Sequence, residues 1–192
     1  MKIVKRIIVL LVIFAGGLYC GKLFFGRKTE IPAPAPTYFS QSAGSGDSLG
    51  MGAGTITGKI LEVKKGQSIQ EAVGKANPGD LIRVFAGSYH EAVYMDQDNI
   101  SITGDIEDGE WPTLDGEKKL NDAILYSGNG TLVENMKITN YKGNGIMGQA
   151  GNNYVIRNNW IVDTGVYGIF PQFGKNGLVE RNVLSGIEDA AI

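Results

Sequence analysis

A block of 23 residues repeats without a gap in the second half of the chain, and this repeat constrains the fold more than any other feature. Its apolar columns are Leu132, Val155 and Leu178; Val133, Ile156 and Val179; Ile138, Ile161 and Leu184; and Ile146, Ile169 and Ile192, with Ala123 one period earlier. Small residues fill two more columns, namely Gly145, Gly168 and Ala191, and Gly128, Gly151 and Gly174. A fixed period indicates a solenoid, in which each unit buries its apolar face by stacking on its neighbours.

The residues between the columns indicate strands and tight turns. The apolar runs at 154–156, 160–162 and 177–179 are short and rich in β-branched residues, and Gly and Asn clusters separate them. A leucine-rich repeat would need a helical return through segments such as 158–160, whose two Asn residues form helices poorly. Three short strands with turns use about 20–25 residues, which is one coil of a parallel β-helix. The fold class predicted for residues 58–192 is therefore all-β.

Asparagine positions support the same prediction. Asn135 and Asn158 share one column, and Asn159 and Asn182 share the next. In coils spaced by about 4.8 Å, stacked Asn side chains can hydrogen-bond to one another along the axis. We therefore expect asparagine ladders in this part of the chain.

A short helix is predicted just before the first coils. Ser68 and Glu71 form a capping box, and the Pro-Gly pair at 78–79 ends the helix. The apolar positions fall on one helical face: Ile69, Ala72, Val73 and Ala76. We expect this helix to cover the open end of the solenoid, where core side chains and unpaired strand edges would otherwise be exposed.

The acidic stretch from Asp105 to Glu117 breaks the repeat, so we expect a loop that bulges from one coil. Such a loop can serve as a cation site or as the lip of a substrate groove. Its carboxylates do not follow the spacing of a calcium-binding loop, which favours a solvated loop. The sequence identifies no cofactor, and Ca²⁺ is the only candidate ion that it leaves open.

Three segments carry a resemblance to a known superfamily. Residues 68–104, 153–170 and 176–192 resemble bacterial right-handed parallel β-helix proteins of the pectin-lyase-like superfamily, and the match extends over 58–192. The resemblance implies a right-handed coil. It does not imply one activity, because the superfamily includes polysaccharide lyases, uronan epimerases, glycosidases, adhesins and accessory proteins. The Asp-Pro-His-Asp signature of alginate epimerases is absent, as are the paired-Asp and His-Gly motifs of polygalacturonases.

Residues 1–28 have the pattern of an export segment. Three basic residues precede the apolar run 7–21, Lys22 interrupts it, and two basic residues close it at 27–28. This pattern fits a cleaved signal peptide or a single-span membrane anchor, with a lipoprotein at Cys20 as a weaker alternative. We predict an exported protein anchored at the cell membrane, facing the periplasm or the extracellular space.

Residues 29–57 are predicted to be a linker, extended in the Pro/Ala-rich part 31–36 and flexible in the Gly/Ser-rich part 41–54. The β-helix domain follows at 58–192. Because Ile192 stands in the register of Ile146 and Ile169, we expect the sequence to stop inside a coil, with the domain incomplete at its C-terminus. Beyond residue 28 the chain has 12 Lys and Arg against 20 Asp and Glu, which disfavours nucleic acid as a partner. The only cysteine, Cys20, precedes the domain, so the domain has no disulfide.

The turn after the 138/161/184 column is the richest place for ligand contacts. It carries the five predicted substrate-binding residues, which are Lys142, Asp163, Tyr167, Glu188 and Asp189. Lys142 and Glu188 share a column two coils apart. Tyr167 offers a ring for stacking on a sugar, and Lys142 a charge for a uronate. Solvated turn residues are the alternative interpretation.

Other polar and aromatic residues have mainly structural interpretations. Glu134, Arg157 and Glu180 share a column of alternating charge, which predicts a ladder of salt bridges. His90, the sole histidine, is interpreted as an ordinary polar residue. The aromatic residues Tyr154, Phe170 and Phe173 either form a platform for a sugar or pack around the coil, and the sequence leaves both open.

Three classes of function remain open. The first is an envelope protein that binds polysaccharide without chemistry, with polysaccharide and membrane as partners. The second is a carbohydrate-active enzyme: a uronan lyase or C5-epimerase needs a base and a cation, and a glycoside hydrolase needs two positioned carboxyl groups. The third is a structural or accessory β-helix protein that resembles a maturation factor. No complete catalytic set appears in the sequence, and no catalytic residue is assigned.

Overall fold

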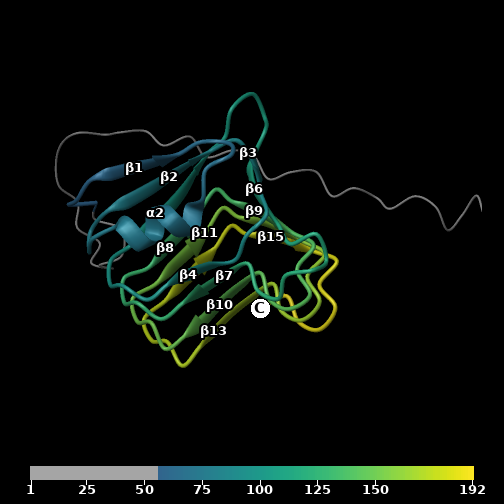
Figure 1. Cartoon of the computed structure of the whole chain (residues 1–192). Coiled ribbons are helices and arrows are strands. Elements are labelled where there is room, and N and C mark those ends of the chain that lie inside the picture. Colours follow the sequence, from purple (N-terminus) through teal and green to yellow (C-terminus); the bar gives the residue numbers. More distant parts are fainter. Residues whose placement is uncertain (1–55) are drawn as a thin grey trace, which may run out of the picture. The chain divides into compact units, whose positions relative to one another are not determined.

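The computed structural model describes residues 56–192, and the predicted export segment and nearly all of the linker lie outside them. In the described part the chain winds through three parallel sheets, here called A, B and C, and forms about five coils (Figure 1). Each full coil gives one strand to each sheet in turn. The predicted all-β, right-handed parallel β-helix is confirmed.

Sheet A contains β1 (Ile60–Val63), β2 (Leu81–Phe85), β5 (Ser101–Asp105), β8 (Leu132–Glu134), β11 (Val155–Arg157) and β14 (Leu178–Glu180). Sheet B contains β3 (Gly87–Tyr89), β6 (Pro112–Asp115), β9 (Lys137–Thr139), β12 (Trp160–Val162) and β15 (Val183–Ser185). Sheet C contains β4 (Val93–Met95), β7 (Ile124–Tyr126), β10 (Ile146–Gln149) and β13 (Ile169–Gln172). A residue in one strand therefore lies beside the equivalent residue of the coils before and after it.

The predicted columns hold in register wherever the 23-residue period holds, but the Ile192 side chain, expected to stack inward, is 65% exposed. Ile156 pairs with Val133 and Val179 in sheet A, and Ile146 pairs with Ile169 in sheet C. One column member was wrong: the partner of Ile146 in the preceding coil is Ile124, not Ala123.

The shift of one residue arises between β10 and β11. Tyr126 pairs with Gly148, whereas Gly128 stacks against Gly151, so the later coil has one more residue between these two points. Ala150 lies in this interval and has a φ of 106°, which is rare for a residue with a side chain. The extra residue is therefore taken up at the end of β10.

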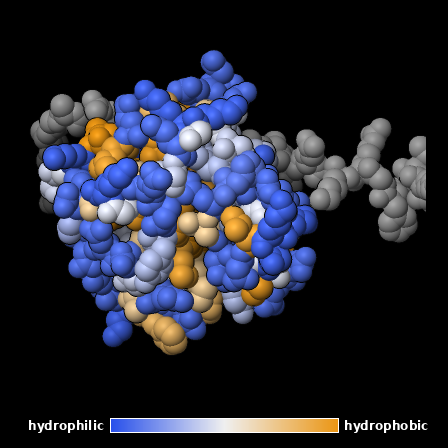
Figure 2. Space-filling view, viewed as in Figure 1, coloured by the Kyte–Doolittle hydropathy of each residue, from blue (hydrophilic) through white to orange (hydrophobic). Residues whose placement is uncertain are grey.

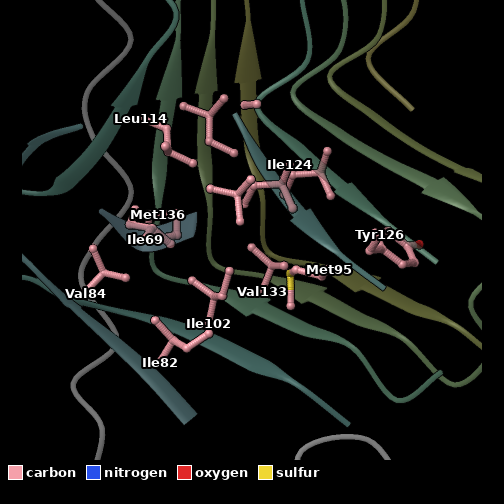
Figure 3. Close-up of a cluster of buried hydrophobic side chains, with 14 of the residues drawn as sticks. Ile69, Ile82, Val84, Met95, Ile102, Leu114, Ile124, Tyr126, Val133 and Met136 are labelled. Carbon is pink, nitrogen blue, oxygen red and sulfur yellow. The ribbon is translucent and has the colours of Figure 1, made fainter. Parts of the chain in front are cut away.

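Each strand contributes inward-facing apolar residues to the interior, and the residues of successive strands stack on one another. Ile82, Ile102 and Val133 follow one another in sheet A and are fully buried, as Figure 3 shows. Leu114 from sheet B and Ile124 from sheet C complete the same core. Because each coil covers the next, burial comes from stacking rather than from long individual strands.

An asparagine ladder runs inside the corner between sheets A and B, as predicted. The Nδ2 of Asn159 donates to the Oδ1 of Asn182 at 3.0 Å and to the carbonyl of Val133 at 3.1 Å. Asn135 and Asn158, in the neighbouring column, share a left-handed backbone with φ of 58° and 54°. Asn tolerates this conformation better than most residues do, so these positions turn the chain sharply from sheet A to sheet B.

The predicted helix is present as α2 (Ile69–Lys75). The Ser68 side chain caps it by accepting a hydrogen bond from the Glu71 amide at 3.1 Å, as predicted. The Glu91 carboxylate also caps it, because it accepts from the amides of Ile69 at 2.8 Å and Gln70 at 3.0 Å. Two carboxylate bonds and one hydroxyl bond thus satisfy the first amides of the helix.

Helix α2 covers the beginning of the solenoid. Ile69 and Val73 are buried in the core, and Figure 1 shows α2 beside β2 and β4. The side-chain amide of Gln70 pairs with the backbone of Tyr94 in β4, whose amide donates to the Gln70 Oε1 at 2.6 Å. The helix therefore covers both core side chains and a strand edge, as predicted.

The acidic stretch 105–117 is only partly a loop. Glu107 and Glu110 exchange two backbone hydrogen bonds in a tight turn, which projects at the top of Figure 1. Strand β6 follows within the same stretch and places Leu114 fully in the core. The prediction of one continuous loop was wrong for 112–115, because Leu114 supplies an inward apolar residue and the acidic Asp115 follows it outside the core.

Candidate ligand-binding face

The turns that lead from sheet B to sheet C stack in three successive coils. Lys142 donates its amide to Leu120, Gly165 donates to Tyr141 at 3.0 Å, and Glu188 donates to Thr164 at 3.1 Å. Lys142, Gly165 and Glu188 therefore occupy one column, as the sequence predicted for the first and third. A Cβ at Gly165 would lie 2.2 Å from the carbonyl oxygen of Lys142, so only glycine allows these turns to stack so closely.

A hollow of about 220 Å³ opens between these turns. Its lining residues are Lys118, Tyr141, Lys142, Asp163, Gly165, Gly186 and Glu188. Three of the five predicted site residues, Lys142, Asp163 and Glu188, thus surround one hollow. Tyr167 and Asp189 lie outside this lining. The lining includes two lysines, one aspartate and one glutamate, so its composition suits a ligand with polar groups of both kinds.

Besides two glycines, two lining residues were missed by the sequence reasoning. Lys118 comes from the irregular coil, where the repeat gives no register. Tyr141 is almost fully buried, and its hydroxyl donates to the carbonyl of Glu91 at 2.6 Å. Burial raises the pKa of Tyr141 above its ordinary value, with Asp115 and Glu91 adding to the effect, so this hydroxyl stays protonated at physiological pH. Tyr141 thus forms the floor of the hollow.

A second polar ladder positions the neighbouring aromatic ring. The Nδ2 of Asn144 donates to the Oδ1 of Asp122 at 2.7 Å, and its Oδ1 accepts from the amide of Tyr167 at 3.2 Å. The same Nδ2 lies 3.3 Å from the sulfur of Met147. Asn144 is buried, so these bonds fix the backbone of Tyr167 beside the outer face of sheet C.

The outer face of sheet C carries an apolar column, here called the sheet C stripe. It consists of Tyr94, Leu125, Met147 and Phe170, which pair in register from β4 to β13. Tyr94 is 42% exposed and the other three are partly exposed. Figure 2 shows hydrophobic atoms gathered over β7, β10 and β13. The stripe is therefore an apolar track that runs along the solenoid axis.

Tyr167 packs against the last residue of the stripe. Its ring lies 4.4 Å from the ring of Phe170, at an interplanar angle of 38°. The two side chains are partly exposed and form a tilted aromatic pair at the end of the stripe. Both rings offer an apolar face to a ligand, and Tyr167 adds a polar hydroxyl group.

The three aromatic residues that the sequence left open have three different positions. Tyr154 packs in the core, with its ring 5.7 Å from that of Tyr126. Phe170 belongs to the stripe, and Phe173 is 78% exposed just beyond β13. A platform of all three is therefore not formed, because Tyr154 faces the interior.

His90 is in the turn from β3 to β4 and does not line the hollow. Its Nδ1 is 3.4 Å from the Oε1 of Glu117 and 3.3 Å from the carbonyl of Asp115. The residue is exposed at the end of β3. Within residues 56–192 no group of three or more histidine, cysteine or carboxylate side chains is arranged to hold a metal ion.

The comparison with known families agrees with this architecture. A family model described as a right handed beta helix region matches residues 79–192. The chain belongs to this family. No curated protein and no solved structure matches it. Membership of the right-handed β-helix family accounts for the coils and for the face they build, whereas the activity has to be argued from the site itself.

The single helix that the structure describes in 56–192, α2, has seven residues, and no helix in this part reaches the length and apolar character needed to cross a membrane. The predicted anchor at 1–28 and the alternatives for it lie outside the described residues.

Proposed function

We propose that this β-helix protein binds a polysaccharide on the outer face of sheet C and in the adjoining hollow. The observation that carries the proposal is the sheet C stripe, with the Tyr167 and Phe170 rings at its end and charged side chains beside it. A linear polymer that runs along the axis would meet the same kind of contact in one coil after another, at steps of about 4.8 Å.

The chemistry of the face matches the chemistry of sugars. A pyranose ring has apolar C–H faces that stack on aromatic and aliphatic side chains, and its hydroxyl groups need hydrogen-bond partners around its edge. Ser127 lies beside the stripe, where its hydroxyl is 3.3 Å from that of Tyr94. The exposed Gln149 ends β10 on the same side. On the other side, Lys142 and Lys118 in the hollow can bind a uronate carboxylate.

The test measures binding of the full-length protein to a panel of acidic and neutral polysaccharides by calorimetry. Tyr167→Ala and Phe170→Ala should each weaken binding to the best ligand several-fold and leave the melting temperature nearly unchanged. Phe173→Ala is the matched control, because this ring is more exposed but lies off the stripe. If Phe173→Ala weakens binding and neither Tyr167→Ala nor Phe170→Ala does, the ligand binds elsewhere.

A carbohydrate-active enzyme is the second candidate, because Asp163 and Glu188 both line the same hollow. Two carboxyl groups on either side of a glycosidic bond are what hydrolysis requires, and one of them can act as acid while the other acts as base or nucleophile. Incubation of the bound polysaccharide with the protein, followed by analysis of reducing ends, separates the candidates. Product that disappears in Asp163→Asn and Glu188→Gln, with binding retained, would favour the enzyme.

We propose in addition that the protein is exported and held at the membrane. The basic and apolar pattern of residues 1–28 supports this, because it fits an export segment that can remain as an anchor. Fractionation of cells that express the full chain tests it. Recovery in the cytoplasmic fraction would contradict both the export and the anchoring.

A further inference from the structure

A hydroxyl group and an imidazole ring meet at the end of β3. Ser88 lies within this strand and His90 directly after it, and Tyr89 between them belongs to the core. Alternate side chains of an extended chain lie on the same face, so the hydroxyl and the imidazole are both outside the coil. The Ser88 Oγ is 3.5 Å from the His90 Nε2, and both residues are exposed.

The next coil places a carboxylate beside the other nitrogen of the ring. Strand β6 pairs with β3, with Thr113 next to Ser88, so the residues that follow β6 come close to His90. The His90 Nδ1 is 3.4 Å from the Oε1 of Glu117 and 3.3 Å from the carbonyl oxygen of Asp115. The Glu117 amide donates to the Asp115 Oδ1 at 2.9 Å, and this bond fixes the turn.

The neighbours of Nδ1 decide which nitrogen of the ring carries the hydrogen. The Nζ of Lys119 is 2.6 Å from the Oε2 of Glu117, and this hydrogen bond, together with the charges of Lys119 and His90, lowers the pKa of Glu117. Glu117 is therefore a carboxylate at neutral pH. A carboxylate and a carbonyl only accept hydrogen bonds, so Nδ1 is the donor in the neutral imidazole. Nε2 then holds the lone pair that accepts from the Ser88 hydroxyl.

We propose that Ser88, His90 and Glu117 are the nucleophile, the general base and the positioning carboxylate of a second site, which hydrolyses small uncharged esters. A serine hydroxyl becomes a nucleophile when an imidazole accepts its proton and a carboxylate orients that imidazole. The 3.5 Å separation of Oγ and Nε2 suits a site without substrate, because such hydrogen bonds tighten in the complex.

The hollow beside Ser88, here called the β3 hollow, indicates the class of substrate. Its volume is about 850 Å³, and residues of β1, of α2 and of the end of β3 line it. Besides Ser88 and His90, its lining includes the apolar Leu61 and Ala72 and the charged Glu62, Glu71, Glu91 and Lys75. Acidic residues outnumber the basic one, so an anionic acyl group is disfavoured, whereas a short neutral acyl chain can contact the apolar residues.

The reaction has two steps. In the first, Oγ bonds to the acyl carbon, its proton passes to Nε2, and the bond from that carbon to the alcohol oxygen breaks while Nε2 gives the proton to the alcohol. In the second, a water molecule gives a proton to Nε2 and bonds to the acyl carbon, and Oγ leaves and takes the proton back. One ester and one water thus give one alcohol and one carboxylic acid.

Gln67 supplies a donor for the negative oxygen that forms in both steps. It lines the β3 hollow, and its Oε1 accepts from the Lys64 amide at 2.7 Å. The NH₂ group is therefore the end of this side chain that can donate to an oxyanion.

Labelling of the full-length protein with a fluorophosphonate tests the nucleophile. We expect a covalent adduct on Ser88, located by mass spectrometry of tryptic peptides, and a stoichiometric burst of p-nitrophenol from p-nitrophenyl acetate. Ser88→Ala and His90→Ala should each abolish the adduct and the burst. Thr113→Ala is the matched control and should keep both, because this hydroxyl occupies the same column one coil further and donates to the Trp111 carbonyl at 3.0 Å.

Two results would overturn the proposal. One is a parent protein that gives no adduct on Ser88. The other is ester hydrolysis that continues unchanged in Ser88→Ala, which would show that the imidazole acts without the serine.

Glu117→Gln tests the positioning carboxylate. We expect kcat for p-nitrophenyl acetate to fall about tenfold or more with KM nearly unchanged, because the ring loses its orientation and the imidazolium loses its counter-charge. Glu107→Gln, in the exposed turn between β5 and β6, is the control and should keep the kcat of the parent. An unchanged kcat in Glu117→Gln would contradict the proposed arrangement. These measurements involve no polysaccharide, so their outcome is independent of the proposed function.

Discussion

The outer faces of sheet A and sheet C come from the same coils and differ in what they expose. Sheet C presents a stripe of large, partly exposed side chains next to a charged hollow. Sheet A presents smaller aliphatic residues that are almost completely buried, with an ion pair beside them. The repeat therefore builds three sheets with similar backbones. Their outward side chains make the face of sheet C suited to a ligand and the face of sheet A suited to packing.

The largest expected effect is the loss of stability when an inward residue of sheet A is replaced. Ile156→Asp should unfold the domain, because it places an unpaired carboxylate between two coils where Ile156 is fully buried. The cost of burying such a group is several kcal/mol, which is a large part of the stability of a typical domain. Circular dichroism and the melting temperature measure the loss. A soluble variant with cooperative unfolding would contradict the inward register of sheet A.

The second effect concerns the ion pair on the outer face of sheet A. Arg157→Ala should lower the free energy of unfolding by about 1–3 kcal/mol, because it removes the ion-pair partner of the buried Glu134 carboxylate, which also accepts from the Thr103 hydroxyl. Adding Glu134→Gln should recover part of the loss. Chemical denaturation measures both. Arg181→Ala is the control, since its 3.9 Å contact with Glu180 is exposed and should be worth about 0–1 kcal/mol. Equal effects of the two arginine variants would mean that Glu134 is solvated.

The third effect concerns the ladder that supports the sheet C face. Asn144→Ala removes the bonds to Asp122 and to the Tyr167 amide, which should destabilise the protein by about 1 kcal/mol. We expect a larger consequence for polysaccharide binding, because Tyr167 loses its fixed position. Calorimetric titration beside thermal unfolding separates the two. Unchanged binding would show that the aromatic surface does not depend on this ladder.

The smallest effect is expected in the hollow. Lys142→Ala should leave the melting temperature unchanged, since the side chain is exposed, and should weaken binding of a uronate polymer several-fold. Binding of a neutral polymer should change little. If acidic and neutral polymers lose affinity equally, the ammonium group is not what recognises the ligand.

The fold was predictable from the sequence because the coils from β8 onward keep one period, so each column is visible directly. The sheet C stripe was not predictable from the sequence. The spacing from Tyr94 to Leu125, and from Leu125 to Met147, differs from 23 residues. The loop within 105–117 and the extra residue near Ala150 cause these shifts. The regular repeat predicted that Lys142 and Glu188 would share a column. Lys118 could not be placed in this way, because it precedes the regular repeat.

The pattern also could not distinguish inward from outward columns when both are apolar. Leu132 and Val155 form as regular a series as Val133 and Ile156, yet the first pair faces outward and the second faces the core. The charge alternation at Glu134 and Arg157 predicted their contact, but an exposed ladder was expected. Burial depends on what lies over a face, and a periodic sequence carries no information about that.

The contact of Gln70 with β4 concerns the association of this protein with other copies of itself. An unpaired strand edge is a template on which another chain can add a strand, and stacked coils are unusually open to this kind of end-to-end growth. In β4 the amide and carbonyl of Tyr94 are already paired with a side chain that imitates a peptide group. Gln70 therefore occupies hydrogen-bonding groups at this edge of sheet C that another chain would otherwise use to add a strand.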